Sequence, residues 1–165
     1  MMKQLILIAH NIRSTHNVGS LLRTCDGLGA DRVYLTGYTP YPFGQPGDTR
    51  LPHIVNKLDK QINKTALGAE KAMAWQHADD ITQVLEQLKA DGFVIAALEQ
   101  TAGSVPIQAY KRPGKVAIIV GREVEGIEPE VLALCDVTLE IPMRGSKESF
   151  NVAIAASMAL YQLTL

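Results

Sequence analysis

Five short runs of apolar residues, separated by segments of helical periodicity, constrain the fold of this chain more than any other feature of its sequence. The predicted strands cover Leu5 to Ala9, Arg32 to Thr36, Phe93 to Leu98, Val116 to Val120 and Val137 to Ile141. Continuous apolar strands are typical of sheets buried on both faces, and strands that alternate with helices form parallel sheets. The sequence therefore predicts an α/β fold, with a mostly parallel sheet and helices on both faces.

Three segments have the apolar spacing of helices. In the segment from Val18 to Leu28, Arg23 lies about 140° from Val18 at 100° per residue, so its side chain is expected to reach a cleft or a partner surface. A second helix is expected around Ile81 to Leu88. The third, from Ser149 to about Leu163, has almost no polar face, which predicts packing on the sheet and on another subunit.

The segment from Gly37 to Asp59 contains four prolines, and no regular element is expected in it. The length of 165 residues fits one domain over residues 1–165.

Composition limits the classes of protein to which the chain can belong. Hydrophobic residues make up 47% and charged residues 20%, which excludes global disorder. The net charge of −1 argues against a polybasic coat, although local patches can still bind phosphates. No apolar run approaches the ~18 residues that span a bilayer, so no membrane partner is expected. Cys25 and Cys135 form no disulfide framework, which favours a cytoplasmic protein. The four histidines lack metal-ligand spacing, and no metal is expected.

Three corners rich in glycine and polar residues each follow a predicted strand. They are His10 to Arg23, Val120 to Ile127, and Ile141 to Asn151. The first opens a helix, a setting that favours anions. In the third, Ser149 is a candidate N-cap, and Asn151 must find partners once it is buried. Taken singly, each corner is also explained by a capped helix or a plain turn.

Taken together, the corners resemble the three signature motifs of the SpoU (TrmH-type) RNA 2′-O-ribose methyltransferases of the SPOUT superfamily. The matching stretches are Asn17 to Arg23, Gly121 to Ile127 and Ile141 to Val152. Lys64 to Glu70 and Ala97 to Thr101 also fit, and the resemblance runs from about residue 5 to 163. Phe150 stands where many members of the family carry leucine.

This resemblance implies a C-terminal deep trefoil knot, an exception to the usual absence of knots. It also implies a homodimer with the knot helices at the interface, in agreement with the apolar C-terminal helix. The implied cofactor is S-adenosylmethionine, the methyl donor. By similarity, its contacts come mostly from backbone groups of Leu98, Gly121, Ile141, Met143 and Phe150.

The implied reaction is an in-line displacement by a ribose 2′-hydroxyl, in which positioning supplies much of the acceleration. In the family, the arginine that matches Arg23 acts near this hydroxyl from the neighbouring subunit. Because a guanidinium stays protonated, we expect Arg23 to stabilise the developing alkoxide and hold a phosphate rather than act as a base. Asn17, Ser149 and Asn151 would orient the ribose and the loops. Glu123 would hold the second and third corners together.

RNA is expected to bind through local patches. Arg13, Arg122, Arg144 and Lys147 lie in the three corners and would converge around the methyl donor. The chain has no extension before its first strand, which predicts no separate RNA-binding domain and favours tRNA over rRNA as the substrate.

Two alternatives remain at this stage. One is a non-catalytic RNA-binding module with the same fold, which would not need to retain the five candidate catalytic residues. The other is a doubly wound nucleotide-binding enzyme such as a dehydrogenase, which the absence of a G-x-G-x-x-G motif disfavours.

Overall fold

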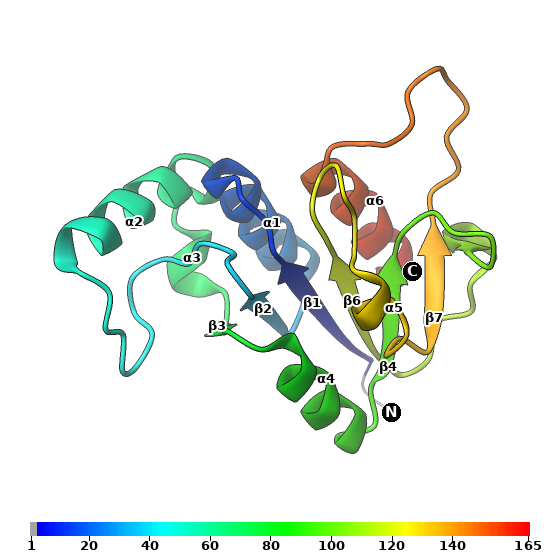
Figure 1. The fold of residues 1–165 in the computed structure, drawn as a ribbon, viewed down its shortest axis with the longest axis horizontal. Coiled ribbons are helices and arrows are strands. Elements are labelled where there is room, and N and C mark those ends of the chain that lie inside the picture. The colour runs from blue at the N-terminus through cyan, green and yellow to red at the C-terminus, as the bar shows by residue number, and fades with distance from the viewer. Residues whose placement is uncertain (1–2) are drawn as a thin grey trace.

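A computed structural model describes residues 3–165 and contains one seven-stranded sheet in the order β3-β2-β1-β6-β4-β7-β5 (Figure 1). All six strand pairings are parallel. The five predicted strands are confirmed as β1 (Gln4–His10), β2 (Arg32–Thr36), β4 (Val94–Leu98), β6 (Lys115–Val120) and β7 (Val137–Glu140). Two further strands, β3 (Trp75–Ala78) and β5 (Val105–Pro106), were not predicted, because these short strands at the two edges lack a continuous apolar run.

The predicted helices are confirmed as α1 (Thr15–Leu28), α4 (Ile81–Ala90) and α6 (Val152–Thr164). Helix α1 begins earlier than predicted because the Ser14 hydroxyl accepts a hydrogen bond from the Asn17 N–H at 3.2 Å and caps the helix. The predicted cap of α6 was wrong: Asn151, not Ser149, is the N-cap. The Asn151 side-chain oxygen accepts from the N–H groups of Ala153 and Ile154, at 2.9 and 3.4 Å.

The prediction of no regular element between Gly37 and Asp59 was also wrong, because helix α2 (Pro52–Ala66) begins inside it. Pro52 stands at the first helical position, where the missing N–H costs nothing, so it starts this helix rather than breaking it. Three short helical elements complete the description: α3 (Ala69–Ala72), η1 (Ile107–Ala109) and α5 (Pro129–Leu132).

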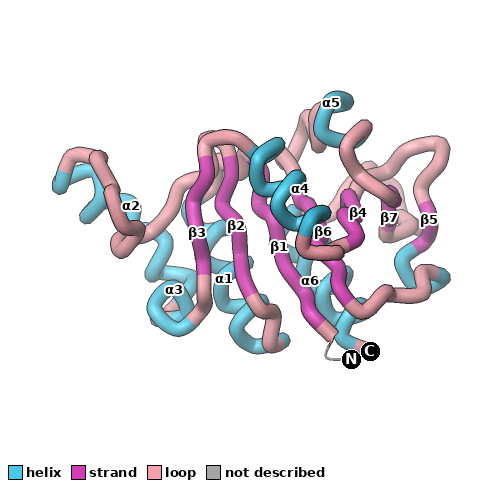
Figure 2. Tube along the Cα trace, turned by 90° about the horizontal axis from the view of Figure 1, so that it is seen from below, coloured by secondary structure: helices cyan, strands magenta, loops and turns pink. Residues whose placement is uncertain are grey.

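Helices cover both faces of the sheet, as predicted. Figure 2 shows α4 and α5 on one face, and α1, α3 and α6 on the other. Alternate residues of the strands point to two separate cores, so that Leu5 and Leu7 of β1 pack with α1 and α6, whereas Ile6 and Ile8 pack with α4. None of the helices within residues 3–165 is long and apolar enough to cross a membrane.

Helix α6 packs with its sheet-facing side in the core, through Val152, Ala156, Leu160 and other small or apolar residues. Its other side exposes Ile154, Met158 and Tyr161, which are 53%, 37% and 58% exposed. The predicted packing of this helix on the sheet is therefore confirmed. The predicted contact with another subunit stays a prediction, and the apolar side chains on that side are exposed in the single chain.

Candidate functional site

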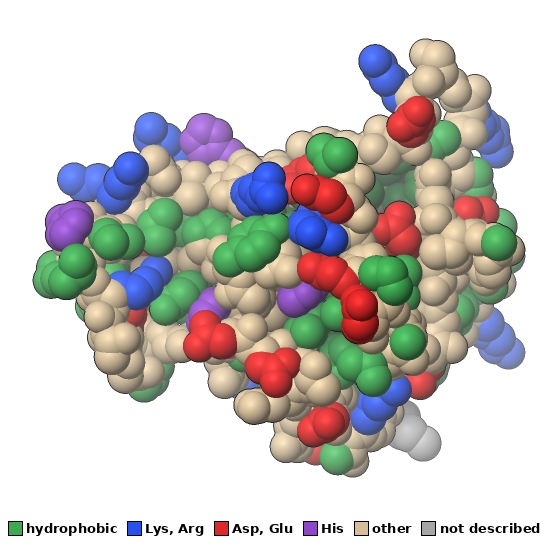
Figure 3. All heavy atoms as spheres, viewed as in Figure 1, with side chains coloured by type: hydrophobic (Ala, Val, Ile, Leu, Met, Phe, Trp, Pro, Cys, Tyr) green, Lys and Arg blue, Asp and Glu red, His purple; other side chains and the backbone are tan. Residues whose placement is uncertain are grey.

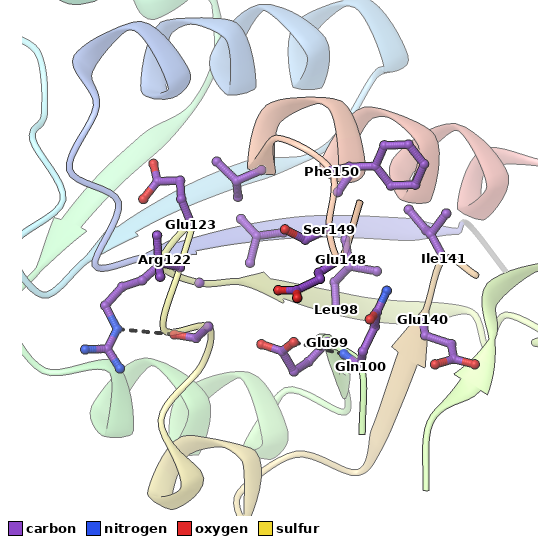
Figure 4. Close-up of a pocket in the computed structure, with 16 residues that line it drawn as sticks. Leu98, Glu99, Gln100, Arg122, Glu123, Glu140, Ile141, Glu148, Ser149 and Phe150 are labelled. Atoms are coloured by element: carbon purple, nitrogen blue, oxygen red, sulfur yellow. Dashed lines mark hydrogen bonds between the residues drawn. The ribbon is translucent and has the colours of Figure 1, made fainter. Parts of the chain in front are cut away.

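A cavity lies at the carboxyl ends of β4, β6 and β7, the end of a parallel sheet where ligands generally bind (Figure 4). Each of these strands delivers residues to it as it ends: Leu98 and Glu99 after β4, Gly121 after β6, and Ile141 after β7. Phe150, from the segment before α6, completes the wall. The second and third glycine-rich corners of the sequence therefore meet at one cavity.

Four of the five residues predicted to bind the cofactor line this cavity: Leu98, Gly121, Ile141 and Phe150. Met143 does not. It lines an adjacent hollow that is formed by residues 142–147 and 149–151. Arg144 and Lys147 line the same hollow. Ser149 and Phe150 lie between the two hollows and contribute to both.

The charged groups of the cavity are mostly acidic. Four carboxylates, those of Glu99, Glu123, Glu140 and Glu148, line it together with one guanidinium, that of Arg122. In a concave site with low-dielectric walls, an excess of one sign of charge raises the local concentration of ligands of the opposite sign. The cavity is therefore suited to a ligand with positive charge and opposes one that carries several phosphates.

Glu99 holds the second corner in place, a role that sequence analysis missed. One oxygen of its carboxylate accepts from the Ile127 N–H at 3.1 Å, and the other accepts from the Gln100 N–H at 2.9 Å. A Cβ atom at Gly126 would lie 2.2 Å from the Glu99 carboxylate, and Gly126 has φ of 71°. The left-handed backbone conformation therefore favours glycine there, and a side chain at this position would also displace the Glu99 carboxylate.

A short chain of hydrogen bonds joins all three corners. The Asn17 side chain donates to Glu123 Oε1 at 3.0 Å, and the Asn151 side chain donates to Asn17 Oδ1 at 3.3 Å. Glu123 was expected to hold the second and third corners, but its side-chain hydrogen bond joins the second corner to the first. Asn151 was expected to be buried, yet it is exposed in the single chain because its oxygen caps α6 at the surface.

Arg23 lies outside the acidic cavity, in a separate groove between α1, the end of α2 and the start of α6. It is exposed, as its position off the apolar stripe predicted. The groove has Asn17 and Asn151 in its wall as well, so the hydrogen-bonded asparagine pair stands between Arg23 and the acidic cavity.

The four predicted RNA-binding residues lie in three different places rather than around one cavity. Arg122 lines the acidic cavity, where its Nε donates to the Gly126 carbonyl oxygen at 3.2 Å. Arg144 and Lys147 line the adjacent hollow. Arg13 is exposed in a third hollow, with its guanidinium 5.9 Å from the ring centre of Tyr38.

A polar network that sequence analysis missed fixes the end of β1 to Glu128, the residue that follows the second corner. Asn11, at φ of 55°, donates to Glu128 Oε1 at 2.8 Å, and His10 Nε2 lies 3.3 Å from Glu128 Oε2. Burial lowers the pKa of His10 against the opposing charge of Glu128. Burial opposes ionisation of Glu128, but hydrogen bonds, including that from Asn11, and the charges of His10 and Arg122 lower its pKa. Within residues 3–165, no group of three or more His, Cys, Asp or Glu side chains could hold a metal ion.

The chain is similar to known proteins both in sequence and in structure. A sequence model of the SpoU rRNA Methylase family matches residues 49–161. A tRNA (guanosine(18)-2′-O)-methyltransferase of Aquifex aeolicus is 29% identical over 160 residues, which are 97% of this chain and 68% of that protein. The 23S rRNA (guanosine-2′-O-)-methyltransferase RlmB of Acinetobacter baylyi is 30% identical over 96% of this chain and 58% of that protein.

Among solved structures, the SpoU methyltransferase AviRb from Streptomyces viridochromogenes in complex with AdoMet superimposes with a TM-score of 0.82. It shares 22% identity, over 99% of this chain and 58% of that chain, and shows that the fold is the same. The chain thus spans between 58% and 68% of the lengths of these three proteins.

Proposed function

Because this chain belongs to the SpoU rRNA methylase family, we propose that it transfers a methyl group from S-adenosylmethionine to a ribose 2′-hydroxyl of RNA. The observation that carries this proposal is the acidic cavity, whose lining includes four carboxylates and one guanidinium. The methyl donor is a sulfonium cation, whereas a dinucleotide such as NAD carries phosphates. The charge of the cavity therefore supports the methyl donor over the dehydrogenase alternative.

Within this proposal, Leu98, Gly121, Ile141 and Phe150 hold the donor at the ends of the strands, and Met143 reaches it from the adjacent hollow. The donor supplies a methyl group on positively charged sulfur, ready for displacement. The chain must then orient the ribose hydroxyl and stabilise its oxygen as the proton leaves.

Asn17, Ser149 and Asn151 are the neutral polar groups that orient the ribose. Glu123 acts by fixing Asn17, since it accepts the hydrogen bond from that side chain at 3.0 Å. Arg23 remains protonated and stabilises the developing alkoxide while it binds a neighbouring phosphate. A module that only binds RNA would need no such hydrogen-bonded set beside a cavity for a cation, and this favours catalysis.

We further propose a homodimer in which each acidic cavity receives Arg23 from the partner subunit. Two observations support it. Arg23 lies in a groove outside the acidic cavity of its own chain. Helix α6 exposes Ile154, Met158 and Tyr161 on the side away from the sheet, an apolar stripe that a second α6 can cover. The segment from Ile141 to Asn151 would close the trefoil knot that the family resemblance implies.

The substrate, in this proposal, is tRNA, bound through Arg13, Arg122, Arg144 and Lys147 by a single domain in the cytoplasm. The named activity of the Aquifex aeolicus relative supports this choice, since the match covers 97% of this chain.

Calorimetry and methyl transfer test the function. We expect S-adenosylmethionine to bind at micromolar levels and NAD not to bind. The double variant Glu140→Gln, Glu148→Gln should bind S-adenosylmethionine more weakly than the unmodified protein does. Its binding of the demethylated product should change less, because only the donor carries the sulfonium charge. Arg23→Ala should keep donor binding and lose transfer of labelled methyl groups to total RNA. Binding of NAD with no heat from the donor would refute the proposal.

A further inference from the structure

One face of α2 carries basic side chains and no acidic ones. His53, Lys57, Lys60 and Lys64 follow each other at intervals of four, three and four residues. At 100° per residue they fall within about 60° of arc, and they extend over about 16 Å of the helix. The opposite side of α2 is the buried one, with Val55 and Ile62. We call the four residues the α2 basic face.

This arrangement does not serve the stability of the helix. Like charges three and four residues apart destabilise a helix, whereas a lysine paired with Glu or Asp at the same spacing would stabilise it. Within residues 3–165, none of the three lysines forms an ion pair. The carboxylate of Asp59, the acidic residue of this helix, instead accepts from the Phe43 N–H at 3.0 Å. The lysines are therefore free to bind an external anion.

The α2 basic face leads into the groove that holds Arg23. Lys64 lines this groove together with Arg23, and the remaining lining residues include the hydroxyl groups of Ser20, Thr24 and Ser157 but no carboxylate. The groove is thus the reverse of the acidic cavity in charge. Figure 3 shows Lys, Arg and His side chains gathered over α2, and Figures 1 and 2 show α2 extending beyond the β3 edge of the sheet.

The packing of α2 against α1 fixes this continuity. The Thr65 hydroxyl donates to the His16 carbonyl oxygen at 2.8 Å, next to Lys64 in sequence. Gly19 of α1 lies so close to α2 that a Cβ atom there would be 2.3 Å from the Ile62 carbonyl oxygen. Lys64 and Arg23 therefore line the same groove because α2 is packed tightly against α1 at this point.

We propose that the α2 basic face binds the phosphate backbone of the RNA substrate and leads the strand to Arg23. This proposal rests on the proposed function, because it takes the RNA to be the molecule whose ribose is methylated. A row of lysines can bind successive phosphates of a strand. The groove adds hydroxyl groups that can donate hydrogen bonds to phosphate oxygens, and it contains no carboxylate that would repel them. Contacts of this kind supply affinity and register, and they leave the choice of nucleotide to other surfaces.

The test is a salt titration of RNA binding by the triple variant Lys57→Gln, Lys60→Gln, Lys64→Gln. Glutamine keeps the size and the helix propensity of lysine and removes only the charge. The probe is fluorescently labelled unfractionated tRNA, measured by anisotropy between 0.05 and 0.5 M salt. Each lost phosphate contact lowers the slope of log K against log salt by about 0.7–0.9, so the variant should lose about 2 to 3 from the slope. If the affinities converge near 1 M salt, the loss at 0.1 M is about 100- to 500-fold.

The matched control removes three lysines that precede the central strands of the sheet, away from α2, with Lys3→Gln, Lys89→Gln and Lys111→Gln. Lys3 and Lys111 precede β1 and β6, and Lys89 is in the last turn of α4, which leads into β4. The net charge changes equally, so this control should retain the slope and affinity of the unmodified protein. Equal circular dichroism and melting temperature of both triple variants show that the fold is intact.

Methyl transfer separates this inference from the proposed function. For the double variant Lys57→Gln, Lys60→Gln, the KM for tRNA should rise more than tenfold, with the loss in KM rather than in kcat. If the unmodified protein transfers methyl groups and the triple variant matches the control in slope and KM, the inference is overturned and the function stands. If the unmodified protein binds tRNA through these lysines but methylates neither tRNA nor rRNA, the function is overturned and the α2 basic face stands. Binding to anionic vesicles that depends on these lysines, with tRNA binding unchanged, also overturns the inference.

Discussion

The contact between α1 and α2 at Gly19 allows a prediction whose sign differs from that given by helix propensity. Replacing glycine by alanine inside a helix normally stabilises it by about 0.8–1.0 kcal/mol. In Gly19→Ala, however, the new Cβ atom would lie 2.1 Å from Thr65 Oγ1 and 2.3 Å from the Ile62 carbonyl oxygen, where an ordinary contact begins at 3.4 Å. The Thr65 side chain can rotate, but the Ile62 carbonyl is backbone. The two helices must therefore separate by about 1 Å, in the range of overpacking changes that cost about 1–3 kcal/mol or more.

Subtracting the gain in helix propensity from the upper end of that range leaves a net loss of about 2 kcal/mol in the free energy of unfolding. For a chain of this length, such a loss lowers the melting temperature by about 4–8 °C. The assay is urea unfolding followed by far-ultraviolet circular dichroism, at one protein concentration, since association with a second chain would shift the midpoint.

The matched control is Gly27→Ala in the same helix, where nothing lies within 4 Å of the new Cβ atom. This variant should be as stable as the original protein or gain up to about 1 kcal/mol. A Gly19→Ala protein as stable as the Gly27→Ala protein would refute the reasoning, because it would mean that α1 and α2 do not approach closely at that point.

Two further predictions concern carboxylates. Glu99→Gln leaves one of its two backbone N–H partners without an acceptor, and a hydrogen bond to a charged group contributes about 1.5–3 kcal/mol. Calorimetry should give about a tenfold weaker binding of S-adenosylmethionine, and unchanged binding would show that Glu99 does not hold the 121–127 corner. The hydrogen bonds from Arg50 lower the pKa of Asp48 to about 2. A pKa lowered on folding means that the stability from this pair is complete above the ordinary pKa of about 4 and is lost as the pH falls toward 2. The unfolding free energy of Asp48→Asn should fall less steeply than that of the unmodified protein between pH 4 and pH 2.

The strands that form the sheet interior were predictable because each is a continuous apolar run, and burial on both faces requires such a run. The edge strand Trp75–Ala78 was not predictable in this way. An edge strand needs no continuous apolar run, and none of its four residues is fully buried. Helix α2 was not predicted because it begins in a proline-rich segment with no obvious regular element, although proline at the first helical position favours a helix.

For the site, the family resemblance, rather than any local pattern, indicated Leu98, Gly121, Ile141 and Phe150. The structure brings these four residues to one cavity because the parallel strands β4, β6 and β7 end at the same side of the sheet. The position of Met143 outside the cavity depends on the path of an irregular segment, and the sequence carries no periodic signal for such a path. The contact between Asn17 and Glu123 joins residues 106 positions apart, which a single sequence does not encode in any local pattern.

The relay from Glu123 through Asn17 to Asn151 has a consequence for how the protein matures on the ribosome. Its last member caps the final helix, and that helix lies more than 130 residues from the first corner along the chain. A growing chain can form β1 and α1 early, but the relay stays incomplete until α6 has emerged and docked. The ability to bind the proposed methyl donor and RNA should therefore arise in one late step. Folding should also be slow, because it depends on contacts between residues far apart in the sequence. Partly synthesised chains would then carry Arg23 on the first helix without the assembled centre in which we propose that it acts.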